Sequence, residues 1–378
     1  MAYILLYKLM MWNCLGRIQI KQKIILFASL LVLPLLLPAQ EIIRNPDKPL
    51  SSNAGRVLEV EEMFRISDKS GEFFFKWPSG LKIADDGSIF LIDEFQFLKF
   101  TPEGTYLKNI FQKGQGPGEF QSSFLFYHLQ HEKIFVYDLM NTKIVCMDQE
   151  GELIEEFKLS ERYSGFVGLR KDHFILTKNI WPDMTEQTGK VFEIPVKIFF
   201  ISQGGDIIDE CSGIPMRQFL HPNISRSMIE SATILSEDGK ACFISDPDEY
   251  MVSVLDLEKL EFIRKFTRDY RRVKRPKRKT PSRPSIKIPE REYEKDIVYL
   301  YNFKGDLWIE TSTEDEKKGT LFDVFNREGR YIDSFWLDAG KSLITTHGDH
   351  LFVREQDEEG NISVVKYRLS TVYRGPAL

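Results

Sequence analysis

The chain has 378 residues, among them 29 Phe, 14 Tyr and 5 Trp, and its formal net charge is −5 at pH 7. This length suits either two ordinary domains or one propeller. The weak negative charge implies no overall attraction to nucleic acid, and the abundance of aromatic residues favours a β-rich core.

Residues 1–39 have the pattern of a targeting segment. Basic residues at 21–23 precede an apolar run at 24–38, and Ala39 provides the small residue needed before a cleavage site. The run of about 15 residues is shorter than the roughly 20 that cross a membrane, which favours a secretory signal peptide. The alternative is an uncleaved N-terminal anchor, because residues 1–11 are also apolar.

Residues 40–56 contain Pro, Asn and Ser with little periodicity. This composition predicts a flexible tether between the leader and the first folded residues.

A repeated strand pattern begins at residue 87. Residues 87–114 have alternating apolar residues interrupted by turn residues, which predicts three antiparallel strands, and residues 132–159 repeat this pattern. The matched positions are Ile89 with Ile134, Leu91 with Val136, and Asp93 with Asp138.

The same unit continues to the end of the chain. Four more copies follow at 172–211, 239–268, 305–336 and 348–369, the last one strand short. We expect the innermost strands just before each copy, at 81–84, 124–129, 166–169, 233–235, 298–301 and 343–346. Four strands in roughly 40 to 45 residues are typical of a propeller blade.

The pattern therefore predicts an all-β fold, a six-bladed β-propeller of four-stranded antiparallel blades. The strand-like residues 57–66 are expected to pair beside 363–369 and to close the ring, which removes the exposed sheet edges. On this basis the propeller covers residues 57–370, and 371–378 form a tail.

Two features resemble the bacterial six-bladed β-propeller proteins related to NHL-repeat domains. One is the repeated pattern at 89–104 and 134–151, and the other is the sequence GQGPGEF at 114–120. The resemblance covers residues 57–369. It implies the propeller architecture but says little about activity, since propellers include hydrolases, lyases, isomerases and binding modules.

The glycine-rich stretch 114–120 has two interpretations. Its backbone can present N–H groups outward, so Gly116, Gly118 and Glu119 are candidates for a concave anion or carbonyl site. Alternatively, the stretch is a crossover between two blades, with Phe120 filling the core between them. It lacks the Lys-Ser/Thr ending of a phosphate-binding loop.

Other chemically notable residues are expected to have structural roles. Asp93 and Asp138 recur after the same strand, so we expect them to cap the following turns and not to act as catalytic or metal-binding carboxylates. The pairs His128/His131 and His347/His350 lie in strand-like segments, where positions three apart face opposite sides. Cys146, Cys211 and Cys242 are expected to be buried thiols, although a Cys211–Cys242 bridge is an alternative.

Two insertions provide candidate binding residues. Residues 178–193 include Trp181, and residues 213–231 include Arg217 and Phe219. Long loops on a rigid ring commonly carry binding residues, and exposed Trp, Phe and Arg would suit a protein or carbohydrate partner. Packing of these loops onto their own blades is the alternative.

A basic segment spans residues 264–279, with ten Lys or Arg and one Asp. Its charge and the following prolines predict a disordered or extended loop. In an exported protein, Arg271, Arg272, Lys274 and Arg275 could contact lipid head groups, an acidic polysaccharide or an acidic partner. The alternative is a solvated linker without a ligand, and no nucleic acid is expected.

No nucleophile elbow, zinc-protease motif or paired Cys/His motif is present in the sequence. We therefore expect a periplasmic or secreted binding module that holds a protein or glycan partner through its loop face and channel mouth. No cofactor or metal site is predicted. The alternative is a calcium-dependent propeller hydrolase or a lyase.

Overall fold

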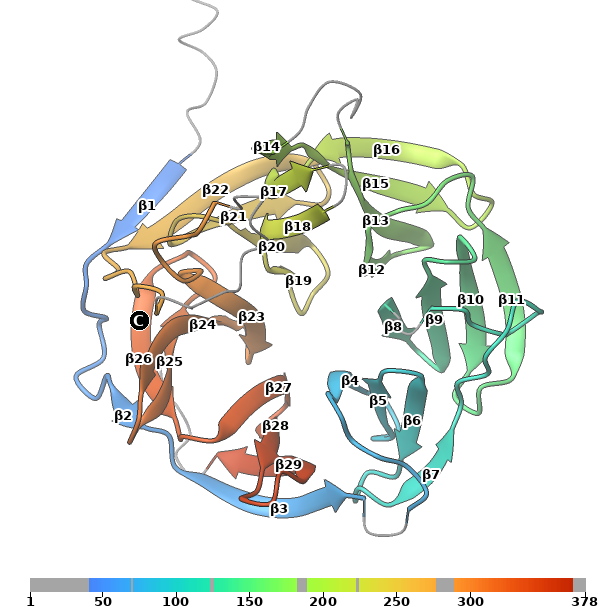
Figure 1. Cartoon of the computed structure of the whole chain (residues 1–378), viewed down its shortest axis with the longest axis horizontal. Coiled ribbons are helices and arrows are strands. Elements are labelled where there is room, and N and C mark those ends of the chain that lie inside the picture. The colour runs from blue at the N-terminus through green and yellow to red at the C-terminus, as the bar shows by residue number, and fades with distance from the viewer. Residues whose placement is uncertain are drawn as a thin grey trace, which may run out of the picture. The chain divides into compact units, whose positions relative to one another are not determined.

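All regular structure in the described part of the chain is β-strand, and this computed structural model is shown in Figure 1. The described residues are 41–68, 71–122, 126–181, 189–221, 224–276 and 289–369. Within these ranges there is no helix long and apolar enough to cross a membrane. The expected leader, 1–39, and the expected tail, 371–378, lie outside the described residues.

The strands form six antiparallel four-stranded blades. In each blade the first strand named is the innermost and the last is the outermost. Blade 1 contains β4 (Ser79–Ile83), β5 (Ile89–Asp93), β6 (Gln96–Phe100) and β7 (Tyr106–Asn109). Blade 2 contains β8 (Phe126–Gln130), β9 (Lys133–Asp138), β10 (Lys143–Asp148) and β11 (Leu153–Lys158). Blade 3 contains β12 (Gly165–Arg170), β13 (His173–Asn179), β15 (Val196–Ser202) and β16 (Ile207–Ser212).

The second half of the ring follows the same plan. Blade 4 contains β19 (Thr233–Leu235), β20 (Ala241–Ser245), β21 (Met251–Asp256) and β22 (Glu261–Arg268). Blade 5 contains β23 (Ile297–Phe303), β24 (Asp306–Asp315), β25 (Gly319–Phe325) and β26 (Tyr331–Leu337). Blade 6 contains β27 (Lys341–His347), β28 (His350–Gln356), β29 (Ile362–Leu369) and β3 (Val60–Ser67). The predicted six-bladed propeller is confirmed.

The first strand of each blade faces the centre of the ring. In chain order, β4, β8, β12, β19, β23 and β27 each contact the next, and β27 contacts β4. This closed circle confirms the six innermost strands expected from the sequence. Phe124 and Leu125, at the start of one of them, lie outside the described residues.

The hydrophobic core lies between neighbouring blades. Within β9, Ile134 and Val136 pack towards blade 1, whereas Phe135 and Tyr137 pack towards blade 3. Because a blade is covered on both sides, alternating side chains are all buried. Each of the six contacts between neighbouring blades has such a hydrophobic cluster.

Residues 42–67, which we call the N-terminal belt, follow the outer edges of three blades. β1 (Glu41–Asn45) lies beside β22 of blade 4, and β2 (Arg56–Val57) pairs in parallel with β26 of blade 5. β3 pairs antiparallel with β29, with Ile66 opposite Val364 and Val60 opposite Leu369. The prediction that this strand closes the ring is confirmed.

The prediction that residues 40–56 form a flexible tether is wrong for residues 41–56, which the structure describes. The Asn45 side-chain amide donates hydrogen bonds to the carbonyls of Thr267, at 3.0 Å, and Gly329, at 2.9 Å. Its side-chain oxygen accepts one from the Tyr331 N–H at 3.0 Å. The Arg56 guanidinium also pairs with the buried Asp333 at 2.8 Å. The sequence shows no periodicity in this region because the belt is held by short pairings and by these two polar side chains.

The two insertions of blade 3 pair with each other as strands. This corrects the prediction that both are long loops. β14 (Lys190–Ile194), from the first insertion, pairs with β17 (Met216–His221), which pairs with β18 (Ile224–Ile229). We call these three strands the extra sheet. Ile194, Met216 and Leu220 form its small apolar cluster.

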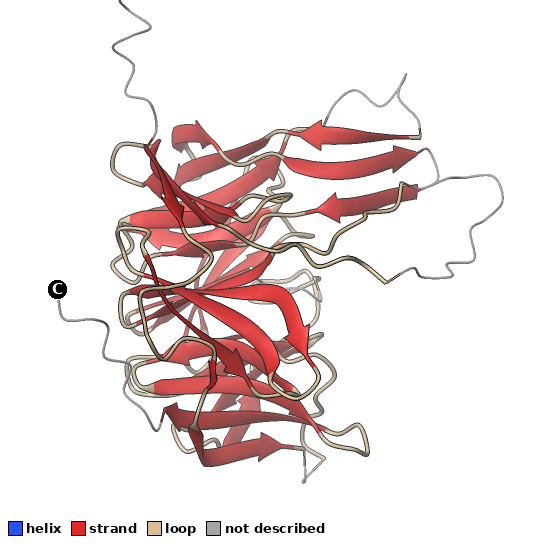
Figure 2. Ribbon diagram, turned by 90° about the vertical axis from the view of Figure 1, so that its left-hand side faces the viewer, coloured by secondary structure: helices blue, strands red, loops and turns tan. Residues whose placement is uncertain are grey.

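The extra sheet and the basic segment emerge on the same face of the ring. In an antiparallel blade, the connection that enters the first strand and the turn between the second and third strands lie on one face, which we call the loop face. β14 lies in such a turn, and β17 and β18 precede the first strand of blade 4. Figure 2 shows the extra sheet extending to one side of the blades.

Candidate binding site

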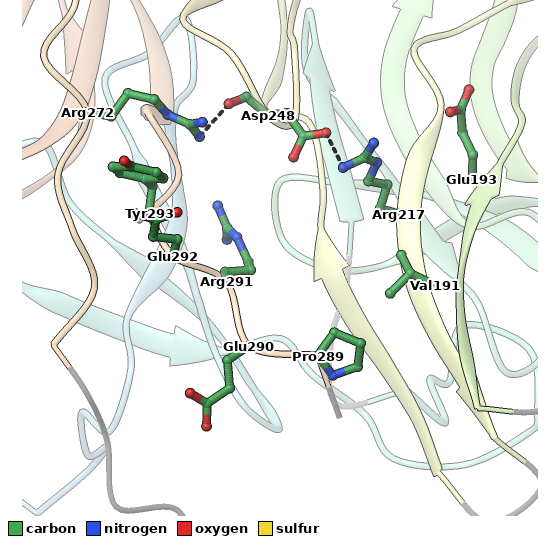
Figure 3. Close-up of a pocket in the computed structure, with 10 residues that line it drawn as sticks. All are labelled: Val191, Glu193, Arg217, Asp248, Arg272, Pro289, Glu290, Arg291, Glu292 and Tyr293. Atoms are coloured by element: carbon green, nitrogen blue, oxygen red, sulfur yellow. Dashed lines mark hydrogen bonds and ion pairs between the residues drawn. The ribbon is translucent and has the colours of Figure 1, made fainter. Parts of the chain in front are cut away.

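A cleft of about 540 Å³ lies on the loop face between the extra sheet and the basic segment. We call it the arginine cleft; Figure 3 shows the residues that line it. They are Val191, Glu193, Arg217, Asp248, Arg272, Pro289, Glu290, Arg291, Glu292 and Tyr293.

Two extended segments pair to form one wall of the arginine cleft. The Arg275 N–H donates to the Glu292 carbonyl at 2.9 Å, and the Glu294 N–H donates to the Val273 carbonyl at 2.8 Å. This short pairing places Arg272 against Tyr293, with its guanidinium 4.8 Å from the ring centroid.

Three guanidinium groups from separate parts of the chain surround Asp248. Arg217 Nη1 lies 2.9 Å from Asp248 Oδ2, and Arg272 Nη2 donates to the Asp248 backbone carbonyl at 2.6 Å. In Figure 3, Arg291 projects towards this carboxylate from below, whereas the Glu193 and Glu290 carboxylates point away from it. Of the three groups, Arg217 pairs with the Asp248 carboxylate, whereas Arg272 binds the backbone carbonyl of Asp248.

The electrostatics around Arg291 favour a nearby negative charge, although four acidic residues also line the cleft: Glu193, Asp248, Glu290 and Glu292. Burial lowers the pKa of Arg291, and the nearby Arg275 guanidinium lowers it further. Burial also lowers the pKa of Lys295 to about 8. The Arg217–Asp248 pair is exposed and contributes at most about 1 kcal/mol, so an external anion could displace Asp248 from Arg217 at little cost.

The structure brings together two groups of residues that were predicted separately. Arg217, from the second insertion, and Arg272, from the basic segment, line the same cleft. Arg275 pairs with Glu294 at 3.2 Å, and Arg271 and Lys274 are exposed on the same segment.

The two aromatic candidates differ in exposure. Trp181 is 47% exposed and does not line the cleft. Phe219 is fully buried, so the expectation that its side chain is exposed for binding is wrong. It lies in the paired middle strand of the extra sheet, in a region whose sequence predicted a loop.

The basic segment is not a loop throughout. Its first five residues, 264–268, belong to β22, and Arg268 is buried with its side chain only 7% exposed. Residues 269–276 are extended, in agreement with the sequence, and residues 277–279 lie outside the described residues.

The glycine-rich stretch 114–120 lies away from the arginine cleft, and its backbone donors are already bonded. The Gly116 N–H donates to Glu119 at 2.8 Å, and the Gly118 N–H donates to Glu156 at 2.9 Å. Phe120 is fully buried in the core between blades 1 and 2, as the crossover interpretation expected. An external anion would have to displace these two carboxylates, and the anion site at this stretch stays a prediction.

The two repeated aspartates bind backbone N–H groups. Asp138 accepts from Met140 at 3.1 Å, in the following turn, and from Gln121 at 2.8 Å. Asp93 differs from the expectation because it binds the connection that precedes its blade, accepting from Lys76 at 2.6 Å and Trp77 at 2.9 Å.

The histidines and cysteines form no metal site in the part of the chain that the structure describes. His347 and His350 are cross-strand partners on either side of a two-residue turn, so the expectation that they face opposite sides is wrong. Cys146, Cys211 and Cys242 are free thiols. Among the described residues, no group of three or more His, Cys, Asp or Glu is placed to hold a metal ion. The calcium-dependent alternative stays a prediction.

Sequence reasoning missed Asp248, Arg291 and Tyr293 in the arginine cleft. Arg291 and Tyr293 follow the prolines of the basic region, where mixed charge indicated only a solvated segment. Their role depends on pairing with residues 273–275, and no local pattern predicts that pairing.

Comparison with known proteins supports the architecture. Residues 69–193 match the DUF5128 family model, described as a 6-bladed beta-propeller. A protein from Bacteroides fragilis, named as a candidate exported protein, has a TM-score of 0.56 and 14% identity, covering 87% of this chain and 100% of that chain. A member of the DUF4221 family from Bacteroides vulgatus has a TM-score of 0.51 and 12% identity, covering 84% and 99%. These likenesses show the fold alone, and comparison with curated proteins gave no match.

Proposed function

We propose that this chain is an exported binding propeller, related to NHL-repeat proteins, that holds an acidic polysaccharide in the arginine cleft. The observation that carries the proposal is the set of three guanidinium groups around Asp248, supplied by Arg217, Arg272 and Arg291. The leader pattern at residues 1–39 and the name of the Bacteroides fragilis neighbour support export.

Arginine suits the carboxylates and sulfates of acidic polysaccharides because its planar fork can bind two oxygens at once. The cleft combines rigid and extended elements: Arg217 projects from a paired strand, and Arg272 is held by the buried Asp296 at 3.0 Å. Tyr293 adds an aromatic wall, against which a sugar ring could pack. The exposed Lys274 and Arg271 extend the basic surface beyond the cleft.

The test compares two arginines of equal exposure. The side chains of Arg217 and Arg368 are each 49% exposed, and each forms an ion pair with an acidic residue. Arg368 lies in β29, outside the cleft, and serves as the matched control. Binding of the mature chain to polygalacturonate would be measured by titration calorimetry at low and physiological salt.

We expect Arg217→Gln to weaken binding by roughly tenfold, as for the loss of one charge-assisted hydrogen bond, and Arg368→Gln to leave it unchanged. Equal losses in the two variants, or no binding to polygalacturonate, would overturn the proposal. Tighter binding to polyglutamate or to vesicles containing anionic lipid would instead assign the cleft to an acidic protein or to a membrane surface.

A further inference from the structure

A second cleft, of about 700 Å³, lies elsewhere on the loop face and shares no lining residue with the arginine cleft. We call it the Trp77 cleft. Its walls come from the connection before blade 1, the β24–β25 connection, the β26–β27 connection and the end of β28. The lining residues with aromatic or charged side chains include Trp77, Glu314, Glu316, Lys341, Arg354 and Glu355.

Trp77 is exposed but its backbone is fixed. Its side chain is 61% exposed, which is unusual for the largest aromatic residue. Its N–H donates to Asp93 Oδ1 at 2.9 Å, and Asp93 is fully buried. The repeated aspartate of blade 1 therefore positions an exposed tryptophan at the cleft.

The Arg354 guanidinium packs on the face of the Trp77 ring, 3.6 Å from its centroid. It forms no hydrogen bond or ion pair with any residue in the described part of the chain. Burial lowers the pKa of Arg354, although the nearby Glu310 opposes this effect. A guanidinium has five N–H donors in a fixed plane, and those of Arg354, which lines the cleft, make no hydrogen bond to a described residue.

Glu310 lies near Arg354 but accepts no hydrogen bond from it, and Glu310 Oε2 is bonded to Tyr301. Tyr301 Oη lies 2.8 Å from Glu310 Oε2 and 2.9 Å from the Leu343 carbonyl oxygen. The Tyr301 hydroxyl has one proton for these two acceptors, so both contacts are hydrogen bonds only when Glu310 is protonated. Burial raises the pKa of Glu310 to about 7, and the Tyr301 hydroxyl opposes this effect.

The rim of the Trp77 cleft is acidic. Five lining residues are acidic, namely Glu314, Asp315, Glu316, Glu355 and Asp357, whereas Lys341 and Arg354 are the basic ones.

Some of these charges are already engaged. Glu355 pairs with Arg65 at 2.8 Å, and Asp315 accepts from the Lys317 N–H in its own turn at 2.9 Å. The side chains of Glu314 and Glu316 are exposed and have no hydrogen bond or ion pair among the described residues. Such a rim repels polyanions and attracts a ligand that carries a cation beside its carboxylate.

We propose that the Trp77 cleft binds a small zwitterion, either a free basic amino acid or the basic C-terminal residue of a peptide. The ligand carboxylate pairs with Arg354, and the cationic side chain lies near Glu314 and Glu316. The aliphatic part of the ligand packs near Trp77, whose exposed surface is then covered. This site is independent of the polysaccharide proposal because the two clefts use different residues.

The experiment is calorimetric titration of the mature chain with L-arginine and L-lysine. Argininamide lacks the carboxylate, and L-glutamate lacks the cationic side chain, so both are expected to bind at least tenfold more weakly than L-arginine. A short peptide ending in lysine, compared with its C-terminal amide, distinguishes a peptide terminus from a free amino acid. Millimolar binding of L-arginine is sufficient support if these differences are observed.

Variants assign the binding to the cleft. Arg354→Gln is expected to weaken L-arginine binding at least tenfold, whereas Arg368→Gln, outside both clefts, leaves it unchanged. The double variant Glu314→Gln/Glu316→Gln changes only exposed residues and is expected to weaken L-arginine binding several-fold. Equal binding of arginine and argininamide, full binding by Arg354→Gln, or no binding of any probe would overturn the proposal.

Discussion

Arg268 and Arg354 have similar neighbouring groups but differ in burial and in hydrogen bonding. Each guanidinium lies near aromatic rings, a carboxylate and tyrosine hydroxyls. Arg268 lies in the core between blades 4 and 5, where its side chain is 7% exposed. Arg354 lies at the Trp77 cleft, where it is partly exposed.

The Arg268 cluster is fully hydrogen-bonded. Asp323 accepts from Arg268 Nε at 2.8 Å, from Tyr250 at 2.5 Å and from Tyr331 at 2.6 Å. The guanidinium also lies 4.9, 4.9 and 5.1 Å from the ring centroids of three tyrosines. Each nitrogen of the guanidinium and both tyrosine hydroxyls therefore have an acceptor within the protein.

Arg354 shows the reverse pattern. Its carboxylate neighbour, Glu310, is bonded to Tyr301, and its own donors have no acceptor among the described residues. The comparison teaches that an arginine among aromatic rings is not in itself a binding residue. What distinguishes a structural cluster from a candidate site is whether the protein itself satisfies the hydrogen bonds.

The largest effect is expected from Asp323→Ala. Removing this carboxylate leaves the Arg268 charge and two tyrosine hydroxyls buried without an acceptor, which should lower the free energy of unfolding by about 3–5 kcal/mol. Urea unfolding followed by tryptophan fluorescence would measure the loss. The control is Asp209→Ala, an exposed aspartate, which should change stability by less than about 0.5 kcal/mol. Similar small losses in both variants would contradict a structural role for the Arg268 cluster.

The second prediction concerns pH and Glu310. Its folded pKa of about 7 lies above the ordinary value of 4.5, so the native state binds more protons and loses stability as pH rises through 7. Glu310→Gln removes this loss. The variant should exceed the parent by up to about 3 kcal/mol at pH 9 and match it near pH 4.

Thermal unfolding measured across this pH range would check the prediction, with the exposed Glu358→Gln as the control. If Glu310→Gln gives no gain at high pH, Glu310 is ionised at little cost and supplies a permanent counter-charge to Arg354. The two arginine clusters would then differ less, because each guanidinium would have a carboxylate beside it.

The blades could be predicted from the sequence because their signals are local. Apolar strands followed by turn residues recur in every blade, and burial of both blade faces makes the middle strands nearly continuous apolar runs. The closing strand was also predictable, because blade 6 lacked one strand and residues 57–66 had the matching pattern.

The functional clusters could not be predicted in the same way. The charges at 264–268 suggested a solvated loop, and only the packing of blades 4 and 5 provides Arg268 with Tyr331 and Asp323. Trp77 lies in the connection before blade 1 and Arg354 lies in blade 6, so ring closure brings them together. Sequence periodicity identifies which strands exist but not which polar side chains meet across them.

The third prediction tests the N-terminal belt, which adjoins the Arg268 cluster at Tyr331. Asn45→Ala removes three hydrogen bonds to Thr267, Gly329 and Tyr331 and should cost about 1–3 kcal/mol. Asn53→Ala lies in the same belt but is exposed, and it should have an effect below about 0.5 kcal/mol. Urea unfolding of both variants would check this, and equal effects would mean that the belt contributes no specific stability through Asn45.

The smallest stability change is expected from Arg354→Gln. This variant tests directly whether Arg354, unlike Arg268, has no structural role. The substitution breaks no hydrogen bond or ion pair with a described residue and removes a partly buried charge, so stability should change by less than about 0.5 kcal/mol. Arg268→Gln, by contrast, leaves Asp323 buried without its cation and should cost about 3 kcal/mol or more. Both values would come from urea unfolding at pH 7.

A large loss in Arg354→Gln would mean that its packing on Trp77 holds blades 1 and 6 together, as Arg268 does for blades 4 and 5. The exposed tryptophan would then be a structural support, and the absence of a hydrogen-bond acceptor among the described residues would need another explanation. A negligible loss, together with weakened binding of L-arginine, would separate the two arginines by role: one stabilises the ring, and the other is kept available for a ligand.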